Sequence, residues 1–546
     1  MSASDDLAAV AATSGEFDNR SGELAGAFEE TPSGGVAAAA LVIGIGNVSS
    51  RLLGLVRELV IAALFGATGA TSAFRTATRV STAVYDLLLS GATTSALVPV
   101  FSEYAARGDT AELSRIVSTF VNVTLTGLGL VVAALVIFAP LLVRALGAEA
   151  DFFDLAVDLT RITLPTILLL GVSGILTAVL YARRSFMVTA LVAAIYNVGI
   201  ILAALTLARF MSIYSLAIGI GLGALLQIAI QLPALRGMRY QAVIALRHPG
   251  VRLVLRLYTP VFVGMLASYA VVVIDTHLAW LTGPDSVAAM AFATTLIQFP
   301  IGLVGAATSL AILPSLSRLA LRSDDAGEQI FVATLMRGLK LVVLLIVPIG
   351  VSMVVLREPL VGALFQRFAF DQRATERTAV ALLAYSPQLP FVVVDQLLIV
   401  AYYARKQTRT PVLVGFVGIG VYLVVALSTI APLGMPGLAL ANAVQNSVHA
   451  VVLYALLARR YPLLRAADLI GFVAAIGLGG ALCALGVWAA SAALGGHLVG
   501  GPTLLRLAFV AASSCIGVTV YCGALRALRV EELAEVAALA VRLARR

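Results

Sequence analysis

The sequence predicts an all-α polytopic membrane protein of about fourteen transmembrane helices, arranged as two parallel six-helix repeats about a pseudo-two-fold axis along the membrane normal, with two extra C-terminal helices. Three observations predict this fold class. Hydrophobic residues make up 60% of the 546 residues and charged residues 12%, with a mean hydropathy of +1.00, whereas soluble domains have about 25% charged residues. Apolar segments long enough to cross a bilayer recur along the whole chain. Short motifs of the first half return in the second half, as in transporters built from repeats.

An acidic tail, residues 1–35, precedes the first apolar segment. It contains seven Asp and Glu residues and one basic residue, Arg20, among many Ser, Gly and Ala residues. It has no basic stretch followed by an apolar core, the pattern of a signal peptide. We therefore expect a disordered cytoplasmic extension.

Apolar segments separated by charged or Gly- and Pro-rich breaks follow this tail. Each is about 20 residues long or longer, as a membrane-spanning helix requires. The fourteen predicted spans are residues 36–66, 70–103, 116–144, 152–181, 186–208, 213–235, 257–282, 286–316, 329–356, 378–403, 411–431, 436–458, 467–494 and 503–525.

The spans divide into two lobes and an appendage. Spans 1–6, residues 36–235, are expected to form the N-lobe, and spans 7–12, residues 257–458, the C-lobe. A basic cytoplasmic linker, residues 236–256, joins them. Spans 13 and 14, residues 467–525, lie outside the repeat. Residues 526–546 are expected to form a basic cytoplasmic helix that could rest on an anionic inner leaflet.

The distribution of basic residues predicts the orientation of the spans. If the N-terminus is cytoplasmic, most loop arginines and lysines fall in cytoplasmic loops, as Arg183, Arg184, Arg405 and Lys406 do, and few fall in outer loops. Cytoplasmic loops of membrane proteins are enriched in Arg and Lys. The asymmetry therefore predicts that both termini are cytoplasmic and that the number of spans is even.

The repeat rests on two pairs of motifs. LVPVFSEYAARGD (residues 97–109) aligns with ILPSLSRLALRSD (residues 312–324). Pro165 precedes a Tyr-Ala-Arg-Arg motif by the same spacing by which Pro387 precedes Tyr-Ala-Arg-Lys. Six predicted spans separate equivalent points, so the two halves should cross the membrane in the same direction and could rock against each other around a central site.

Four prolines occupy equivalent positions in the two repeats. Pro99 corresponds to Pro314, and Pro165 corresponds to Pro387. A proline interrupts the helical hydrogen-bond ladder and bends a helix. We expect the four to be hinge points for rocking; static kinks are the alternative.

The first two spans carry an unusual number of ionisable residues. The otherwise apolar stretch from Asn47 to Tyr104 contains Arg51, Arg57, Glu58, Arg75, Arg79 and Asp86. One ionisable side chain at the centre of a membrane helix costs ~2.5 kcal/mol or more, so such a cluster predicts a substrate path. The path is mainly cationic, and planar guanidinium groups bind diphosphates through paired hydrogen bonds. We therefore expect these six residues to bind an anionic substrate.

Helical spacing places some of these residues on common faces. Arg75 and Arg79 share a face, and Asp86 lies seven residues further along it, so an Arg79–Asp86 pair could hold this stripe together. Arg51 and Arg57 lie on different faces and could contact one small group only if their helix bends. In the alternative interpretation, the arginines reach the membrane interface or pair internally.

Three further polar sets lie in apolar spans. They are Asp275 with His277, Asp395 with Gln396, and the helical patch of Asn442, Gln445, Asn446 and His449. Any of them could bind a coupling cation, Na⁺ or H⁺, or relay protons, and interhelical packing is the alternative. Asp395 is the first candidate for ion coupling and Asp275 the second. Asn197 is interpreted as a packing residue.

The runs SRLLGLVRE, FGATGATSAF and SGATTSALVPVFSEY resemble the MurJ/MviN family of lipid II flippases, within the multidrug/oligosaccharidyl-lipid/polysaccharide exporter superfamily. FPIGLVGAATSLAILPSLSRLA (residues 299–320) and YYARKQTRTPV (residues 402–412) resemble it too. The resemblance covers about residues 40–530. It implies a non-enzymatic, multi-pass transporter of the bacterial inner membrane that moves an undecaprenyl-diphosphate-linked peptidoglycan precursor from the inner to the outer leaflet by alternating access, during cell-wall biosynthesis. The partners are then this substrate and membrane lipids, without nucleic acid, and we expect a monomer.

The resemblance also assigns residues. Arg51 and Arg57 match the two arginines of the family's first helix, and Glu58 stands where an Asp is usual. The sequence departs from the family elsewhere: Tyr85-Asp86 replaces an arginine pair, Ser72 replaces an Asp, and Thr294-Thr295 replaces an Asp-Arg. Two of the four arginines that the resemblance assigns to the lipid head group are therefore absent.

Other functions compete with lipid II transport. The absent arginines favour a related exporter of another lipid-linked glycan or of drugs, or a non-transporting membrane scaffold. A membrane glycosyltransferase or polymerase usually needs convergent carboxylates or a His in a large outer loop, and the loop at residues 357–378 shows no such pattern. The sequence has no nucleotide-binding or zinc-binding motif. Apart from a coupling cation, no cofactor is expected, and energy would come from an ion gradient, the membrane potential or the cargo gradient.

Overall fold

In the computed structural model, the described residues are 33–87, 97–245, 251, 253–254, 269–305, 316, 318–319, 325–461, 464, 468–498 and 501–534. Within these ranges the chain is helical, without β-strands, as the predicted fold class requires. Most of the acidic tail, parts of the linker at 236–256, Pro314 and the end of the basic C-terminal helix lie outside the described residues.

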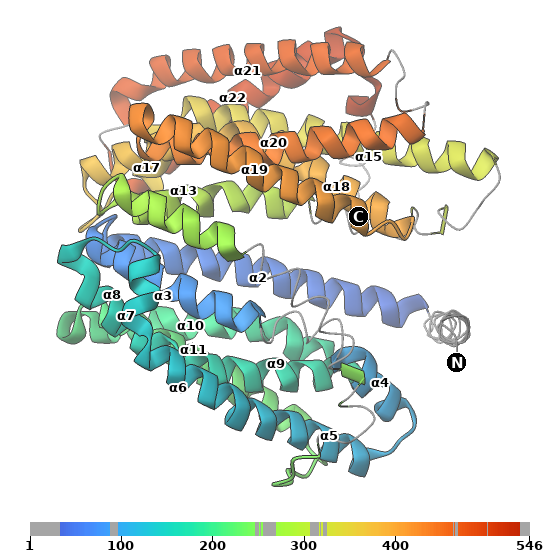
Figure 1. The fold of residues 1–546 in the computed structure, drawn as a ribbon. Coiled ribbons are helices and arrows are strands. Elements are labelled where there is room, and N and C mark those ends of the chain that lie inside the picture. The colour runs from blue at the N-terminus through green and yellow to red at the C-terminus, as the bar shows by residue number, and fades with distance from the viewer. Residues whose placement is uncertain are drawn as a thin grey trace.

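The first half of the chain forms one group of helices and the second half another (Figure 1). The first group consists of α2 (Ser33–Phe65), α3 (Gly69–Tyr85), α4 (Val98–Ala106), α5 (Thr110–Val123), η3 (Thr124–Leu128), α6 (Gly129–Ile137), α7 (Ala139–Ala145), α8 (Ala150–Thr163), α9 (Thr166–Ala182), α10 (Phe186–Met211), α11 (Tyr214–Gln231) and η4 (Leu232–Leu235). The second consists of the helix Tyr269–Leu281, α13 (Ser286–Pro300), η5 (Ile301–Gly305), α15 (Asp325–Val355), α16 (Arg357–Phe365), α17 (Gln372–Tyr385), η6 (Ser386–Gln388), α18 (Leu389–Ala404), α19 (Arg409–Leu433), α20 (Met435–Arg460), α21 (Asp468–Leu498) and α22 (Thr503–Ala527).

Eleven helical stretches in the described part of the chain are long and apolar enough to cross a membrane. They coincide with predicted spans 3–6 and 8–14. Predicted spans 1, 2 and 7 coincide with α2, α3 and the short apolar helix Tyr269–Leu281. Within the described residues, α3 has 17 residues and Tyr269–Leu281 is a short apolar helix. The three helices carry the ionisable residues of the cluster together with Asp275. The count of fourteen spans and the repeat layout stay predictions.

Predicted spans 4 and 10 are each broken at their central proline. Pro165 lies between α8 and α9, at the N-cap of α9, and Pro387 lies within the short turn η6 between α17 and α18. A proline ring excludes the amide hydrogen that would continue the helix. Pro99 is the second residue of α4. The breaks at Pro165 and Pro387 match the predicted positions, and their role as hinges stays a prediction.

Small residues bring α10 into close contact with α2 on one side and with α11 on the other. A Cβ placed on Gly46 would fall 2.5 Å from the Cβ of Ala190, and one placed on Gly199 would fall 2.4 Å from the Cα of Gly223 on α11. Close backbone approach at small residues is the usual way in which membrane helices pack. The packing holds Asn197 of α10 against α2, beside the cluster.

The two halves are joined by hydrogen bonds at one end of the molecule. The amide of Ala369 donates to the carbonyl of Ala63 over 3.1 Å, and the amide of Ala288 donates to Ser72 Oγ over 3.1 Å. Trp280 Nε1 donates to Thr76 Oγ1 over 2.9 Å. At the opposite end, α4 and α5 lie far from α15 and α18 (Figure 1). The halves are therefore closed against each other at the end that contains α3 and α13.

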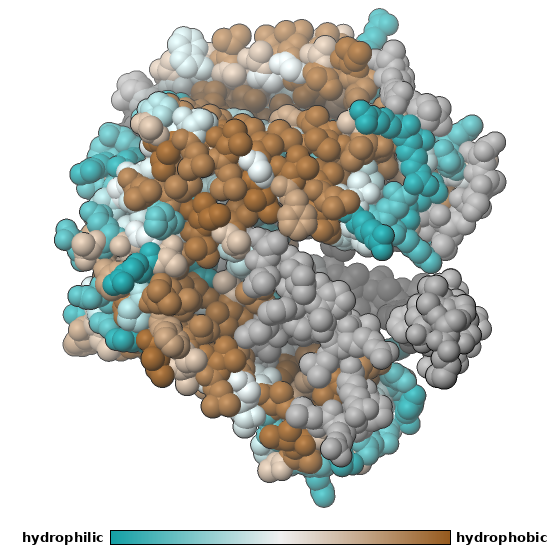
Figure 2. Space-filling view, in the orientation of Figure 1, coloured by the Kyte–Doolittle hydropathy of each residue, from teal (hydrophilic) through white to brown (hydrophobic). Residues whose placement is uncertain are grey.

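The outer face of the second half is apolar. Large hydrophobic side chains are exposed along α19, among them Leu413, Phe416, Val424 and Leu427. Figure 2 shows a broad hydrophobic surface over this half of the molecule. Such a surface is expected where a protein faces lipid.

Candidate functional site

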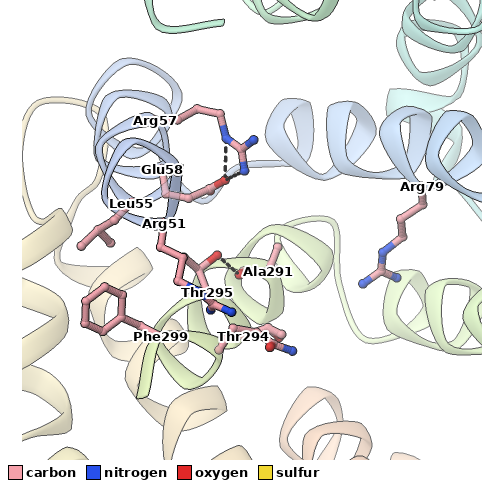
Figure 3. Close-up of a pocket in the computed structure, with 11 residues that line it drawn as sticks. Arg51, Leu55, Arg57, Glu58, Arg79, Ala291, Thr294, Thr295 and Phe299 are labelled. Carbon is pink, nitrogen blue, oxygen red and sulfur yellow. Dashed lines mark hydrogen bonds and ion pairs between the residues drawn. The ribbon is translucent and has the colours of Figure 1, made fainter. Parts of the chain in front are cut away.

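A cavity of about 370 Å³ lies between the two halves. It is lined by Arg51, Gly54, Leu55, Arg57 and Glu58 of α2, by Arg79 of α3, and by Ala291, Thr294, Thr295, Gln298 and Phe299 of α13. The wall formed by α2 and α3 is therefore charged, and the wall formed by α13 is neutral (Figure 3). Four of the six predicted cluster residues therefore meet the second-half residues Thr294 and Thr295 at one site.

Glu58 is the buried centre of the charged wall. Its side chain is 2% exposed and lies between Arg57 and Arg75. Arg57 donates from Nη2 over 2.8 Å, and Arg75 donates to both carboxylate oxygens. A carboxylate at this depth is tolerable only because two guanidinium groups compensate its charge. Glu58 therefore fixes one arginine from its own helix and one from α3.

Arg57 is oriented by two partners. Besides its contact with Glu58, its Nη1 donates to Asn197 Oδ1 over 2.9 Å. Asn197 also donates to the carbonyl of Ser50 over 3.3 Å, so the amide joins α10 to α2. The interpretation of Asn197 as a packing residue missed its contact with Arg57. Asn197 is 140 positions away from Arg57, and no local spacing reveals such a partner.

Arg75 supports the site without lining the cavity. Its side chain is 14% exposed, and its guanidinium lies 5.5 Å from the centre of the Phe292 ring and 6.0 Å from that of Phe74. Such positions over aromatic rings are favourable for a cation. Arg75 thus holds Glu58 in place from behind the cavity wall. The expectation that Arg75 binds the substrate stays a prediction.

Arg79 pairs across the two halves. Its Nη1 lies 3.4 Å from Asp275 Oδ2 on the helix Tyr269–Leu281 and also donates to Thr276. The other oxygen of Asp275 accepts the hydroxyl of Tyr422 over 2.7 Å. Asp275, predicted as an ion-coupling residue, is therefore the counter-ion of Arg79.

The expected Arg79–Asp86 pair is wrong. Asp86 ends α3 and accepts the hydroxyl of Tyr269. Seven residues of an α-helix span about 10.5 Å, so Arg79 reaches the second half more easily than it reaches Asp86. Asp86 is also not among the residues that line the cavity.

Arg51 differs from the other three arginines. Among the described residues it makes no hydrogen bond or ion pair, and its side chain is exposed to the cavity. It extends from α2 toward α13 (Figure 3). Its guanidinium lies on the backbone of Gly302, where an added Cβ would fall 1.6 Å from Nη1. Four guanidinium groups therefore accompany two carboxylates: one positive charge in excess belongs to Arg51, and the other is shared by Arg57 and Arg75 around Glu58.

The second half contains a separate polar group that joins two of the predicted sets. Asp395 of α18 lies 2.6 Å from Nδ1 of His449 on α20. Asn446, one turn before His449, donates to Gln388 of η6 over 2.6 Å. No cluster of three or more His, Cys, Asp or Glu side chains suitable for a metal ion occurs among the described residues.

Known proteins resemble this chain over most of its length. The family model for lipid II flippase MurJ matches residues 61–506. Lipid II flippase MurJ of Burkholderia cenocepacia is 30% identical over 428 residues, which cover 75% of this chain and 81% of that protein. Probable lipid II flippase MurJ of Haemophilus influenzae is 32% identical over 429 residues, covering 75% of this chain and 84% of that protein.

Solved structures share the fold. A lipid II flippase MurJ in an inward closed conformation superimposes with a TM-score of 0.72 at 23% identity, covering 89% of this chain and 99% of that chain. An inward-facing multidrug resistance MATE transporter of the MOP superfamily superimposes with a TM-score of 0.65 at 14% identity, covering 76% and 95% of the two chains. The all-α transporter fold predicted from the sequence is confirmed.

Proposed function

This chain belongs to the lipid II flippase MurJ family, and we propose that it moves lipid II, the undecaprenyl-diphosphate-linked precursor of peptidoglycan, from the inner to the outer leaflet. It is a multi-pass protein of the bacterial inner membrane. Alternating access of the two halves around the cavity would carry the head group across.

The observation that carries this proposal is the charge of the cavity. Four guanidinium groups surround two carboxylates, Glu58 and Asp275, which leaves two positive charges in excess. A diphosphate diester carries two negative charges at neutral pH. Guanidinium groups match its oxygens in geometry as well as in charge. The two positive charges in excess therefore balance the two negative charges of a diphosphate, and no charge is left unpaired in the membrane.

The three arginines that line the cavity have different roles in this proposal. Arg51, which has no hydrogen-bond or ion-pair partner in the described part of the chain, supplies the first contact with the diphosphate. Arg57 and Arg79 are each oriented by a carboxylate and a neutral partner, so little conformational entropy is lost when they bind. Arg75 positions Glu58 and does not contact the lipid.

The neutral wall is suited to the saccharide. Thr294, Thr295 and Gln298 offer hydroxyl and amide groups opposite the arginines, and sugars are recognised by such hydrogen-bonding groups. The head group would lie with its diphosphate against α2 and α3 and its sugar against α13. A different lipid-linked glycan with the same diphosphate would fit the charged wall equally well. Contacts of the sugar with α13 would then determine whether lipid II or the other glycan is transported.

Alternating access requires the closed end to open. The contacts of Ser72 with Ala288 and of Thr76 with Trp280 would break, and the opposite end would close. The helix breaks at Pro165 and Pro387 are suitable places for the bending. With both termini cytoplasmic, the closed end faces outward, and the cavity receives its substrate from the inner leaflet.

Complementation tests the proposed function. A bacterium depleted of its own lipid II flippase is expected to grow when it expresses the wild-type chain or Arg209→Ala, and to lyse with Arg51→Ala present in the membrane at an equal level. Arg209 is the matched control because it is exposed on α10 and stacks on Phe210 outside the cavity. Lysis with the wild-type chain in the membrane would indicate another cargo. Growth with Arg51→Ala would exclude Arg51 as an essential contact.

A further inference from the structure

The two halves are tied together along α3 by side-chain contacts at three levels. The three pairs, in order along α3, are Thr76 with Trp280, Arg79 with Asp275, and Asp86 with Tyr269. The partner numbers fall as the numbers on α3 rise, so α3 and the helix Tyr269–Leu281 lie antiparallel. The first pair belongs to the closed end of the molecule, and the third lies at the other end of α3.

The middle pair differs from the other two in charge and in access. Arg79 and Asp275 form an ion pair, whereas an indole and a hydroxyl are the donors of the other two contacts. Of the six side chains, Arg79 alone lines the cavity. A head group in the cavity can therefore reach the middle contact directly, and it cannot reach the contacts on either side of it.

The contact between Arg79 and Asp275 is one that a phosphate can replace. Its Nη1–Oδ2 distance is 3.4 Å, whereas Arg57 and Glu58 approach to 2.8 Å. The side chains of Arg79 and Asp275 are 26% and 20% exposed, so both groups are partly hydrated. A guanidinium binds phosphate oxygens through paired hydrogen bonds of about 2.7–2.9 Å. A phosphate at Arg79 would thus exchange one long contact for shorter, paired contacts.

The displaced carboxylate keeps a partner in its own half. Asp275 Oδ1 accepts the hydroxyl of Tyr422 over 2.7 Å, and Tyr422 is a buried residue of α19. Asp275 would therefore stay with the second half, while Arg79 and the bound phosphate stay with the first. The exchange removes an ion pair that joins the halves and replaces it with a contact inside one half.

We propose that Asp275 is an internal competitor of the anionic head group, and that its displacement from Arg79 releases the closed end. This inference rests on the proposed function. A ligand shifts a conformational equilibrium only if it interacts differently with the two states, and here the phosphate gains its full contact with Arg79 only when the ion pair is broken. The empty carrier therefore stays closed, and Asp275 makes opening depend on a negatively charged head group.

The test measures the closed end of the full-length chain in nanodiscs. Spin labels are placed at the exposed residues Thr68 and Arg373 on opposite halves, with the three native cysteines replaced by alanine. Lipid II is the anionic probe, and undecaprenol, which has no phosphate, is the neutral one. In the otherwise wild-type chain, lipid II is expected to raise the population at long distances severalfold. Undecaprenol should leave the distances as they are without ligand.

The variants separate the competitor from an ordinary structural contact. Asp275→Asn, which is nearly isosteric, should be open without ligand to the extent that the wild type reaches with lipid II, and lipid II should add little. Asp275→Glu keeps the charge and should restore the dependence on lipid II. Tyr269→Phe is the matched control, because it removes a contact between the same two helices that the cavity does not reach. It should still respond to lipid II.

Two results would overturn the inference. One is an Asp275→Asn variant that stays closed until lipid II is added, as the wild type does. The other is opening of the wild type by undecaprenol, which needs no variant and so holds even if Asp275→Asn does not fold. Flipping of lipid II by the wild type in liposomes is measured alongside. Flipping together with either result would leave the proposed function standing, and absence of flipping would contradict the proposed function itself.

Discussion

Arg51 and Gly302 touch across the two halves of the molecule: a Cβ added to Gly302 would fall 1.6 Å from the Nη1 of Arg51. Gly302 belongs to η5, directly after the neutral cavity wall formed by α13. A glycine at this position lets the guanidinium of Arg51 rest on the backbone of the opposite half. The contact places the least compensated charge of the cavity where the two halves meet.

Gly302→Ala is expected to displace the guanidinium of Arg51 and to reduce flipping severalfold, with little loss of stability, because the end of an arginine side chain can move aside. Flipping in liposomes and thermal unfolding of the purified protein measure the two effects. Gly420→Ala on α19, where an added Cβ meets nothing within 4 Å, is the control. Wild-type flipping by Gly302→Ala would show that the position of Arg51 is unimportant.

Glu58→Gln should lower the stability of the protein substantially. The substitution leaves Arg57 and Arg75 beside a neutral group in a buried environment, and breaking a buried ion pair typically costs about 3–5 kcal/mol. A fall in the midpoint of thermal unfolding, compared with Glu103→Gln, measures this. Glu103 is the control because it pairs with Arg107 at the exposed surface. Equal midpoints for the two variants would contradict the role of Glu58 as the centre of the charged wall.

Asp275→Asn should strengthen the binding of diphosphates. It removes the counter-ion of Arg79 and raises the positive excess of the cavity from two to three. One further charge a few ångströms from an anion is worth roughly 1 kcal/mol in a partly hydrated site, or roughly fivefold in affinity. Titration of the detergent-purified protein with inorganic diphosphate at low salt measures it. Weaker binding by this variant would contradict the charge argument.

The closed end should open more readily when its hydrogen bonds are removed. Trp280→Phe deletes the donor to Thr76, and Ser72→Ala deletes the acceptor of Ala288. Each bond contributes about 1 kcal/mol, so the open population is expected to rise roughly fivefold per substitution. Spin labels at the exposed residues Thr68 and Arg373, on opposite halves, would report longer distances. Unchanged distance distributions would show that these bonds do not hold the end closed.

Local sequence was sufficient for the helices but not for their partners. The apolar runs predicted the eleven long helices because length and hydropathy are local properties, and the breaks at Pro165 and Pro387 follow from the chemistry of proline. The partner of Arg79 was predicted wrongly because Asp275 is 196 positions away. Its position depends on how α3 packs against the second half, which no spacing within α3 encodes.

The separate polar group of the second half shows the same limit. Asp395 and His449 were each singled out as ionisable or polar residues in apolar spans, and their separation of 54 positions hid the pair. Asn197 was likewise recognised as a buried polar residue, yet its contact with Arg57 follows from the close approach of α10 to α2 at Gly46. Residue type predicted the site, and helix packing determined the contacts within it.

The most direct test of the central claim is equilibrium binding of a fluorescent undecaprenyl diphosphate to the purified protein in nanodiscs, compared with the corresponding monophosphate. We expect the wild type and Arg209→Ala to bind the diphosphate at least about tenfold more tightly than the monophosphate, which corresponds to about 1.4 kcal/mol. Arg51→Ala should lose this preference. Equal affinity of the wild type for the two lipids, or a preference that survives in Arg51→Ala, would contradict a cavity whose charge excess recognises the diphosphate.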